Sequence, residues 1–160
     1  MAVDMFMKLA GINGESEDSV HSNEIDVLGW NWGMSNTGTA HLGSGAGTGK
    51  ANFHDLSFTK FVDKASTSLM QACATGKHIA TATLTCRKAG GTPLEYLVIT
   101  MSEVLVSNIQ HGGSMGDERT TESISLNFAS LKVDYKTQSA SGTSEGDTPF
   151  NWSILKNASN

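Results

Sequence analysis

Hydrophobic and polar residues alternate along most of this chain, which is typical of β-strands with one covered face. In the opening segment, Val3, Met5, Met7 and Leu9 fall on one face. Further alternating segments cover residues 25–32, 51–60, 79–88, 94–109, 120–136 and 150–156. Turns rich in glycine separate several of them. The pattern therefore predicts a mainly β protein.

The alternation changes phase at two places. The inward-facing set moves from odd to even positions across Leu28 and Gly29, and again at Ala129 and Ser130. One inserted residue is how a strand accommodates a β-bulge, so strongly bent strands are expected. Bent strands joined by hairpin turns favour an antiparallel β-barrel or closed sandwich, because closure removes exposed sheet edges.

The segment 94–109 is apolar on both of its faces. A strand of an antiparallel sheet normally leaves one face to water, so this segment predicts a second covering layer, either a helix or another subunit. The two faces consist of Tyr96, Val98, Val104 and Val106, and of Leu97, Ile99, Met101, Leu105 and Ile109.

A short α-helix is predicted within residues 63–78. Ser66 or Thr67 can cap its N-terminus, and Gly76 supplies a C-terminal stop. Leu69, Met70 and Cys73 share one face at a spacing of three to four residues. The expected architecture is thus a bent β-barrel with one short helix.

Length and charge narrow the functional classes. A chain of 160 residues is long enough for one domain with a core, and we expect a single domain over residues 1–160. Only 17% of residues are charged, and 11 basic against 16 acidic residues give a net charge of −5. The basic residues form no cluster, which argues against nucleic acid as a partner.

The N-terminal residues 1–11 lack a basic region followed by an apolar run, and no segment approaches about 18 consecutive apolar residues. We therefore expect cytoplasmic synthesis without membrane insertion, and any export must use a route without a cleaved signal peptide. Cys73 and Cys86 form no C-x-x-C pair, so two buried thiols are expected.

The stretch GSGAGTGK at residues 43–50 invites a test for nucleotide binding. A phosphate-binding loop needs G-x-x-x-x-G-K-[ST], in which the first glycine turns the backbone toward phosphate and the last hydroxyl binds Mg²⁺. Aligned on Gly49 and Lys50, the first position holds Ser44 and the last holds Ala51. Both diagnostic positions fail, which favours a flexible glycine loop.

Catalytic and metal-binding patterns are equally weak. The serine-elbow pattern G-x-S-x-G occurs around Ser114 and Ser144, but neither copy leads into a helix. The acidic run at residues 15–18 lacks the glycine and closing glutamate of a calcium loop and is interpreted as solvated. No metal-ligand spacing links His21, His41, His54, His78 and His111. No enzyme activity, cofactor or metal is therefore expected.

The tryptophans leave two interpretations open. Trp30, Trp32 and Trp152 fit core positions on alternating strands, and as an alternative they could line the cavity of a small-ligand-binding β-barrel. Asn31 lies between two of them and must face the other way. In a closed wall that other side meets solvent, a partner or a lumen, which makes Asn31 a candidate partner residue.

Several segments in order resemble the haemolysin-coregulated protein (Hcp) family of bacterial type VI secretion. They are MAVDMFMKLAGINGESED, NEIDVLGWNWG, GKANFHDLSFTKFVDKAS, GKHIATATLTCRKAGG, EYLVITMSEVLVS and ESISLNFASLKVDY. The resemblance runs from residue 1 to about 136. One departure is KASTSL, where family members often carry a proline soon after the serine, which affects the start of the helix.

The resemblance implies a β-barrel with a flanking helix that assembles into a hexameric ring. Stacked rings would form the inner tube of a contractile injection machine, with spike, sheath and effector proteins as partners. The tube is expelled, and effectors travel in its lumen, which Asn31 would face. The glycine loop would reach a neighbouring ring, and its candidate residues are Gly43, Ser44, Gly45, Ala46, Gly47, Thr48 and Gly49.

Overall fold

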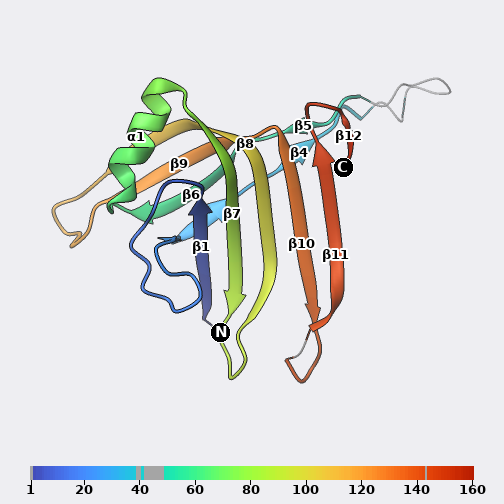
Figure 1. Cartoon of the computed structure of the whole chain (residues 1–160), viewed down its shortest axis with the longest axis horizontal. Helices are drawn as coiled ribbons and strands as arrows, with labels where there is room; N and C mark the ends of the chain where they lie inside the picture. Colours follow the sequence, from blue (N-terminus) through green and yellow to red (C-terminus); the bar gives the residue numbers. More distant parts are fainter. Residues whose placement is uncertain (1, 39–40, 42–48, 143) are drawn as a thin grey trace.

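The computed structural model describes residues 2–38, 41, 49–142 and 144–160, and it shows a large antiparallel sheet with one helix (Figure 1). The elements are β1 (Val3–Leu9), β2 (Ile25–Asp26), β3 (Gly29–Asn31), β4 (Met34–Ser35), β5 (Asn52–Phe53), β6 (Leu56–Phe61), α1 (Ala65–Thr75), β7 (His78–Lys88), β8 (Leu94–Gly112), β9 (Thr121–Asn127), β10 (Ser130–Gln138), β11 (Ser144–Ser153) and β12 (Ala158–Ser159). The longest strands, β7, β8, β10 and β11, all follow the helix.

The sheet follows the order β12-β11-β10-β8-β7-β1-β2, and β9, β6 and β3 continue from the second half of β8. The mainly β, antiparallel architecture with one short helix is confirmed. The closed barrel is wrong, because the ordered strands end in edges at β12 and β2. Between β1 and β6, the link is made by two single backbone hydrogen bonds. The Val27 N–H donates to the Met5 carbonyl, and the Leu28 N–H donates to the Thr59 carbonyl.

Strand β8 changes the side that it turns toward the core at Glu103. This residue has a φ of 51°, in the left-handed region that non-glycine residues rarely adopt. Before it, Ile99 and Met101 are buried, and after it Val104 and Val106 are buried. The apolar residues expected on both faces of this segment therefore belong largely to one inner side, which shifts by one position at the bend.

The predicted phase changes mark places where the chain leaves one strand and enters another. At Leu28 and Gly29 the chain passes from β2, which pairs with β1, to β3, which pairs with β6. At Ala129 and Ser130 it passes from β9 to β10. β10 pairs with the first half of β8 and β9 pairs with its second half. The bent strand β8 therefore connects the β10–β11 strands to the β9–β6–β3 strands.

Helix α1 packs on β8, and Leu69 and Ala72 are among its buried residues. Gly76 ends the helix with a φ of 66°, as predicted. The predicted cap is wrong, since the N-cap position is Lys64 and its side chain makes no cap hydrogen bond. The predicted face is wrong in part, since Met70 is 40% exposed.

A buried polar cluster joins the start of α1 to the sheet. The Lys60 ammonium group is fully buried and contacts the carboxylates of Glu122 and Asp63 and, at 3.1 Å, the Ser66 hydroxyl. That hydroxyl donates to Glu122 Oε1 at 2.6 Å. A buried charge needs such partners because it has left water, so this cluster fixes how β6, β9 and the helix start meet.

Candidate assembly surfaces

One part of the sheet has an apolar face that the chain itself leaves uncovered. The register places Leu97 beside Tyr135, and it places Val133 between Ile99 and Phe150. These side chains share a face with Ile99, which is buried. Toward the open end of the sheet, however, Tyr135 is 43% exposed and Phe150 39% exposed. We call Leu97, Val133, Tyr135 and Phe150 the open patch.

The strand beyond the open patch has a free edge. β11 pairs with β10 along its length, and on its other side it pairs with β12 through Trp152 and Ser153. Residues 144–150 are exposed. An exposed edge presents backbone N–H and C=O groups to any strand of suitable shape. Figure 1 shows β10 and β11 standing apart from the helix-covered part of the molecule.

The opposite face of the same strands carries more polar residues. Lys132 lies between Thr100 and Asn151 in the register, and Asp134 lies between Val98 and Pro149. The open part of the sheet therefore has an apolar face, an opposite face that is more polar, and a free edge. A surface of this kind suits contact with a neighbouring protein on the apolar face and the edge, with the polar face left in water.

The sequence candidates lie on a different part of the sheet. Asn31 is exposed on β3, where it pairs with Ser57 on β6, and this branch is separate from β10 and β11. Of the glycine-loop candidates 43–49, residues 43–48 fall outside the described residues. Gly49 is described, and a Cβ atom there would lie 2.8 Å from the Thr37 Cβ, too close for a larger residue without local movement.

The structure places the two serine candidates in a turn and at the start of a strand. Ser114 sits in the turn between β8 and β9, where its hydroxyl donates to Asp117 Oδ2 at 2.8 Å. Ser144 is the exposed first residue of β11. Neither begins a helix. Within the described residues, no three histidine, cysteine or acidic side chains gather as a metal site.

Two of the three tryptophans, Trp32 and Trp152, pack in a row of rings with Phe53 between them. Trp32 donates its indole N–H to the His54 carbonyl at 2.9 Å, and its ring centroid lies 6.2 Å from that of Phe53. Phe53 in turn lies 6.5 Å from Trp152. Trp30 packs against the core near the buried Cys86, the pKa of whose thiol is raised by burial. These contacts support the core interpretation over a ligand cavity.

Sequence reasoning missed the strap that residues 13–24 form over β1 and β7. The ring of His21 stacks on Phe6 at 4.4 Å, and its two nitrogens lie 2.8 Å from Glu24 Oε2 and 2.7 Å from Glu95 Oε1. Because both partners are carboxylates, only the doubly protonated imidazolium can donate to both. His21 could not be found from its sequence neighbours, since Phe6 and Glu95 are distant in the chain.

The acidic run is part of this strap. Asp18, expected to be solvated, accepts from Arg87 Nη2 at 2.6 Å and from Nη1 at 3.1 Å. The pKa of Asp18 is held well below its usual range, chiefly by the hydrogen bonds from Arg87. The backbone N–H groups of Val20 and His21 donate further hydrogen bonds that lower it. The carboxylates of Asp18 and Asp4 raise the pKa of Arg87. The strap is therefore tied to β7 by charge.

No helix among the described residues has the length and hydropathy needed to cross a membrane.

Comparison with known proteins identifies relatives over nearly the whole chain. The model of the family described as "Type VI secretion system effector, Hcp" matches residues 6–135. The protein hcp1 of Pseudomonas aeruginosa is 53% identical over 159 residues, which covers 98% of both chains.

Solved structures agree with this relationship. Hcp1 from Salmonella typhimurium has 37% identity and a TM-score of 0.83, with all of both chains covered. A structure described as a type six secretion system protein has 31% identity and a TM-score of 0.93, and it covers 99% of this chain and 100% of its own. The resemblance carried by the separate sequence segments is confirmed.

Proposed function

This chain belongs to the Hcp family of type VI secretion systems, and from that premise we propose that it is the subunit from which the inner tube of the secretion apparatus is built. The proposed role is structural and includes no catalytic step. The subunits form hexameric rings, and the rings stack into a tube that is expelled with its cargo. Spike, sheath and effector proteins are its partners.

The observation that carries this proposal is the open patch beside a free strand edge. Tyr135 and Phe150 leave aromatic surface in water on a sheet whose alternation continues that of the buried core. Aromatic residues concentrate at protein interfaces because they bury large apolar areas. A neighbouring subunit that covers this patch and borders β11 would use a different surface of its own, and such a head-to-tail contact closes into a ring after a fixed rotation.

The ring is tested by size and by substitution in the open patch. Light scattering on the purified protein should give about six times the subunit mass of 16.9 kDa, and negative-stain images should show annular particles. Phe150→Asp should yield folded monomers, because a buried carboxylate at the contact would lose its hydration. Val20→Asp, at a residue 69% exposed on the strap, is the matched control and should still form rings. A wild-type monomer at high concentration would contradict the proposal.

Two finer assignments belong to the same proposal. We propose that Asn31 faces the lumen and that residues 43–49 contact the next ring. In assembled tubes, Asn31→Cys should react with a small maleimide and resist one attached to a long polyethylene glycol chain. Deletion of residues 43–49 should leave rings intact and reduce their stacking. Equal labelling of Asn31→Cys by both reagents would contradict the lumen assignment. Normal tubes from the deletion would contradict the contact of residues 43–49 with the next ring.

A further inference from the structure

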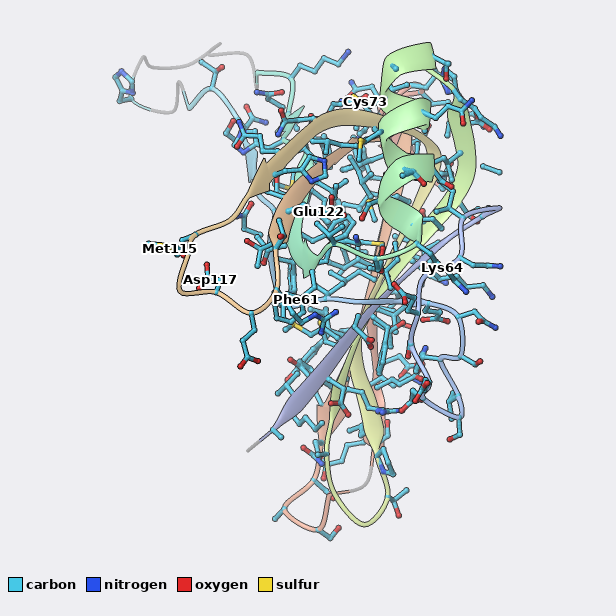
Figure 2. The ribbon with its side chains drawn as sticks, turned by 90° about the vertical axis from the view of Figure 1, so that its left-hand side faces the viewer. Phe61, Lys64, Cys73, Met115, Asp117 and Glu122 are labelled. Atoms are coloured by element: carbon cyan, nitrogen blue, oxygen red, sulfur yellow. The ribbon has the colours of Figure 1, made fainter. Side chains whose placement is uncertain are left out.

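The hairpin between β8 and β9 ends in a turn that holds a methionine entirely in water. The Asp117 N–H donates to the Ser114 carbonyl at 3.1 Å, and the Ser114 hydroxyl donates to the Asp117 carboxylate at 2.8 Å. Met115, between them, has a relative exposure of 104%, and Figure 2 shows it at the tip of the hairpin. The turn is thus a defined structure that presents one apolar side chain.

The base of this hairpin is fastened to the sheet. The Val62 N–H donates to the Thr120 carbonyl at 2.9 Å, and the Arg119 guanidinium group stacks over the Phe61 ring at 4.0 Å. Asp117 and Glu118 lie toward the tip, while Arg119 keeps its positive charge at the base of the hairpin, against Phe61. The hairpin is therefore a braced arm with a methionine and acidic groups at its end.

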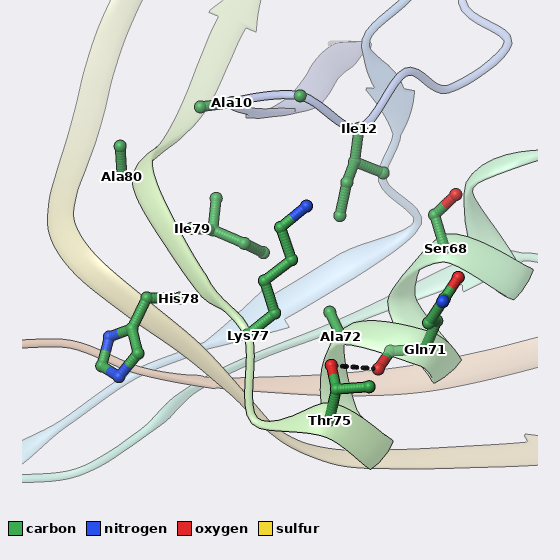
Figure 3. A pocket seen from close by; sticks show the side chains of 11 residues that line it. Ala10, Ile12, Ser68, Gln71, Ala72, Thr75, Lys77, His78, Ile79 and Ala80 are labelled. Atoms are coloured by element: carbon green, nitrogen blue, oxygen red, sulfur yellow. Dashed lines mark hydrogen bonds between the residues drawn. The ribbon is translucent and has the colours of Figure 1, made fainter.

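A groove of about 490 Å³ lies elsewhere on the molecule, between α1, the start of β7 and residues 10–12. Figure 3 shows the side chains of Ile12, Ile79 and Lys77 pointing into the space between strand and helix. Small residues, Ala72 among them, form part of its wall. Ile79 and Ala72 are almost fully buried, so the accessible apolar part of the wall comes mainly from Ile12, Ala10 and Ala80, beside polar groups such as those of Ser68 and Gln71.

The charges of the arm and of the groove are complementary. Lys77 lies at the groove, and in the described part of the chain its ammonium group takes part in no ion pair. Glu118 on the arm is likewise without an ion pair there. A single exposed methionine needs no explanation. A methionine on a braced acidic arm, together with a groove that offers apolar side chains and a free cation, indicates a matched pair of surfaces.

The two surfaces cannot meet within one molecule. In Figure 2 Met115 lies on one side, while α1, which forms one wall of the groove and begins after Lys64, lies on the opposite side. A contact between different surfaces of identical chains is heterologous and repeats from copy to copy. We propose that the arm of one subunit inserts Met115 into the α1–β7 groove of a second copy of this chain, with Glu118 beside Lys77. This inference rests on the proposed tube function and names one contact within it.

Disulfide trapping tests the contact directly. In a Cys73→Ser background, Met115→Cys is combined with Ala80→Cys, which places a thiol in the groove. Mild oxidation of the assembled protein should then give a ladder of covalently linked subunits on a non-reducing gel. Each single cysteine variant is the control and should remain a single subunit on the gel. A double variant that assembles normally and gives no more cross-linking than the single variants would overturn the inference.

Substitutions measure the two components of the contact. Met115→Asp should weaken assembly by roughly tenfold to a hundredfold in apparent affinity, since a buried methionine is lost, and Met115→Leu should restore most of it. Lys77→Glu and Glu118→Lys should each weaken assembly by at most about fivefold, because the pair is exposed. The double variant Lys77→Glu/Glu118→Lys carries the same two charges with exchanged positions in every copy, and it should restore assembly. No recovery in that double variant would overturn the charge pairing.

These results separate the contact from the proposed function. If Met115→Asp assembles as the wild type does while Phe150→Asp is monomeric, the tube function stands and the arm contact is wrong. If the wild type forms no rings or tubes at all, both proposals fail. Circular dichroism of Met115→Asp should match that of the wild type, because the side chain lies outside the core.

Discussion

The sheet has two parts with the same alternation of apolar and polar residues, but the apolar residues are buried in one part and partly exposed in the other. In the covered part, Leu84, Ile99 and Met101 are almost fully buried in the core cluster that also includes residues of α1, β6 and β9. In the open part, Tyr135 and Phe150 continue the same inward set and remain about two-fifths exposed. The difference teaches that one part of the sheet holds the subunit together, while the apolar residues of the other part gain their burial from a neighbour. Substitutions should therefore separate stability from assembly.

The largest expected effect lies in the buried polar cluster of the covered part. Lys60→Met removes the ammonium group shared by the buried Glu122 and the largely buried Asp63, and leaves Glu122 with His111 as its remaining basic partner, which should lower the free energy of unfolding by about 3–5 kcal/mol. Urea unfolding measured on dissociated subunits checks this value. The double variant Lys60→Met/Glu122→Gln should recover part of the loss, and a larger loss in the double variant would contradict the role given to the pair.

Next in size is a truncation of the covered apolar face. Leu84 is fully buried, so Leu84→Ala should cost about 2–5 kcal/mol through lost burial and a new cavity. The same urea titration measures it. A cost well below that range would mean that this region of the sheet is less tightly packed than its burial indicates.

The matched truncation in the open part should behave in the opposite way. Phe150→Ala should change the unfolding free energy of the dissociated subunit by about 1 kcal/mol or less, because the ring is partly in water already. Its effect should instead be a marked loss of rings in light scattering. Equal losses of subunit stability from Phe150→Ala and Leu84→Ala would remove the distinction between the two parts.

The smallest expected effect concerns the strap. Because the pKa of Asp18 is held below its usual range by Arg87, its ion pair stabilises the folded chain above the unfolded pKa of about 4. As pH falls below about 4, the unfolded state gains a proton that the folded state resists, and this stabilisation is lost. Asp18→Asn should therefore be less stable than the wild type at pH 7, and the difference should shrink in acid. A constant difference in urea titrations at pH 7 and pH 3 would contradict the ion pair.

Much of the fold could be predicted from local pattern. Period-two alternation located β1 and β6 to β10, but it placed the start of β11 six residues late and missed β4 and β12. The glycine at residue 76 located the end of the helix, since this signal depends on neighbouring residues. Local pattern failed at α1, where the Ser66 hydroxyl is used by Lys60 and Glu122 and makes no helix cap. The cap prediction could not foresee this, because Lys60 and Glu122 reach Ser66 through the packing of two strands.

The candidate surfaces were less accessible to sequence reasoning. Asn31 was selected by its position between two tryptophans, yet the open patch arises from residues on three strands. Tyr135 and Phe150 each look like ordinary core residues in the sequence, and their exposure became evident from the register and from the absence of a covering layer at this end of the described sheet.

By itself, the sequence determined the mainly β class, the short helix and the family, because alternation, turn residues and ordered motifs are all written along the chain. The tertiary structure alone decided that the sheet stays open, that β8 changes its inner side at Glu103, and which apolar residues are left for a partner. The physical reason is that burial depends on what packs above a strand. That layer is supplied by segments far away in the sequence, or by another molecule.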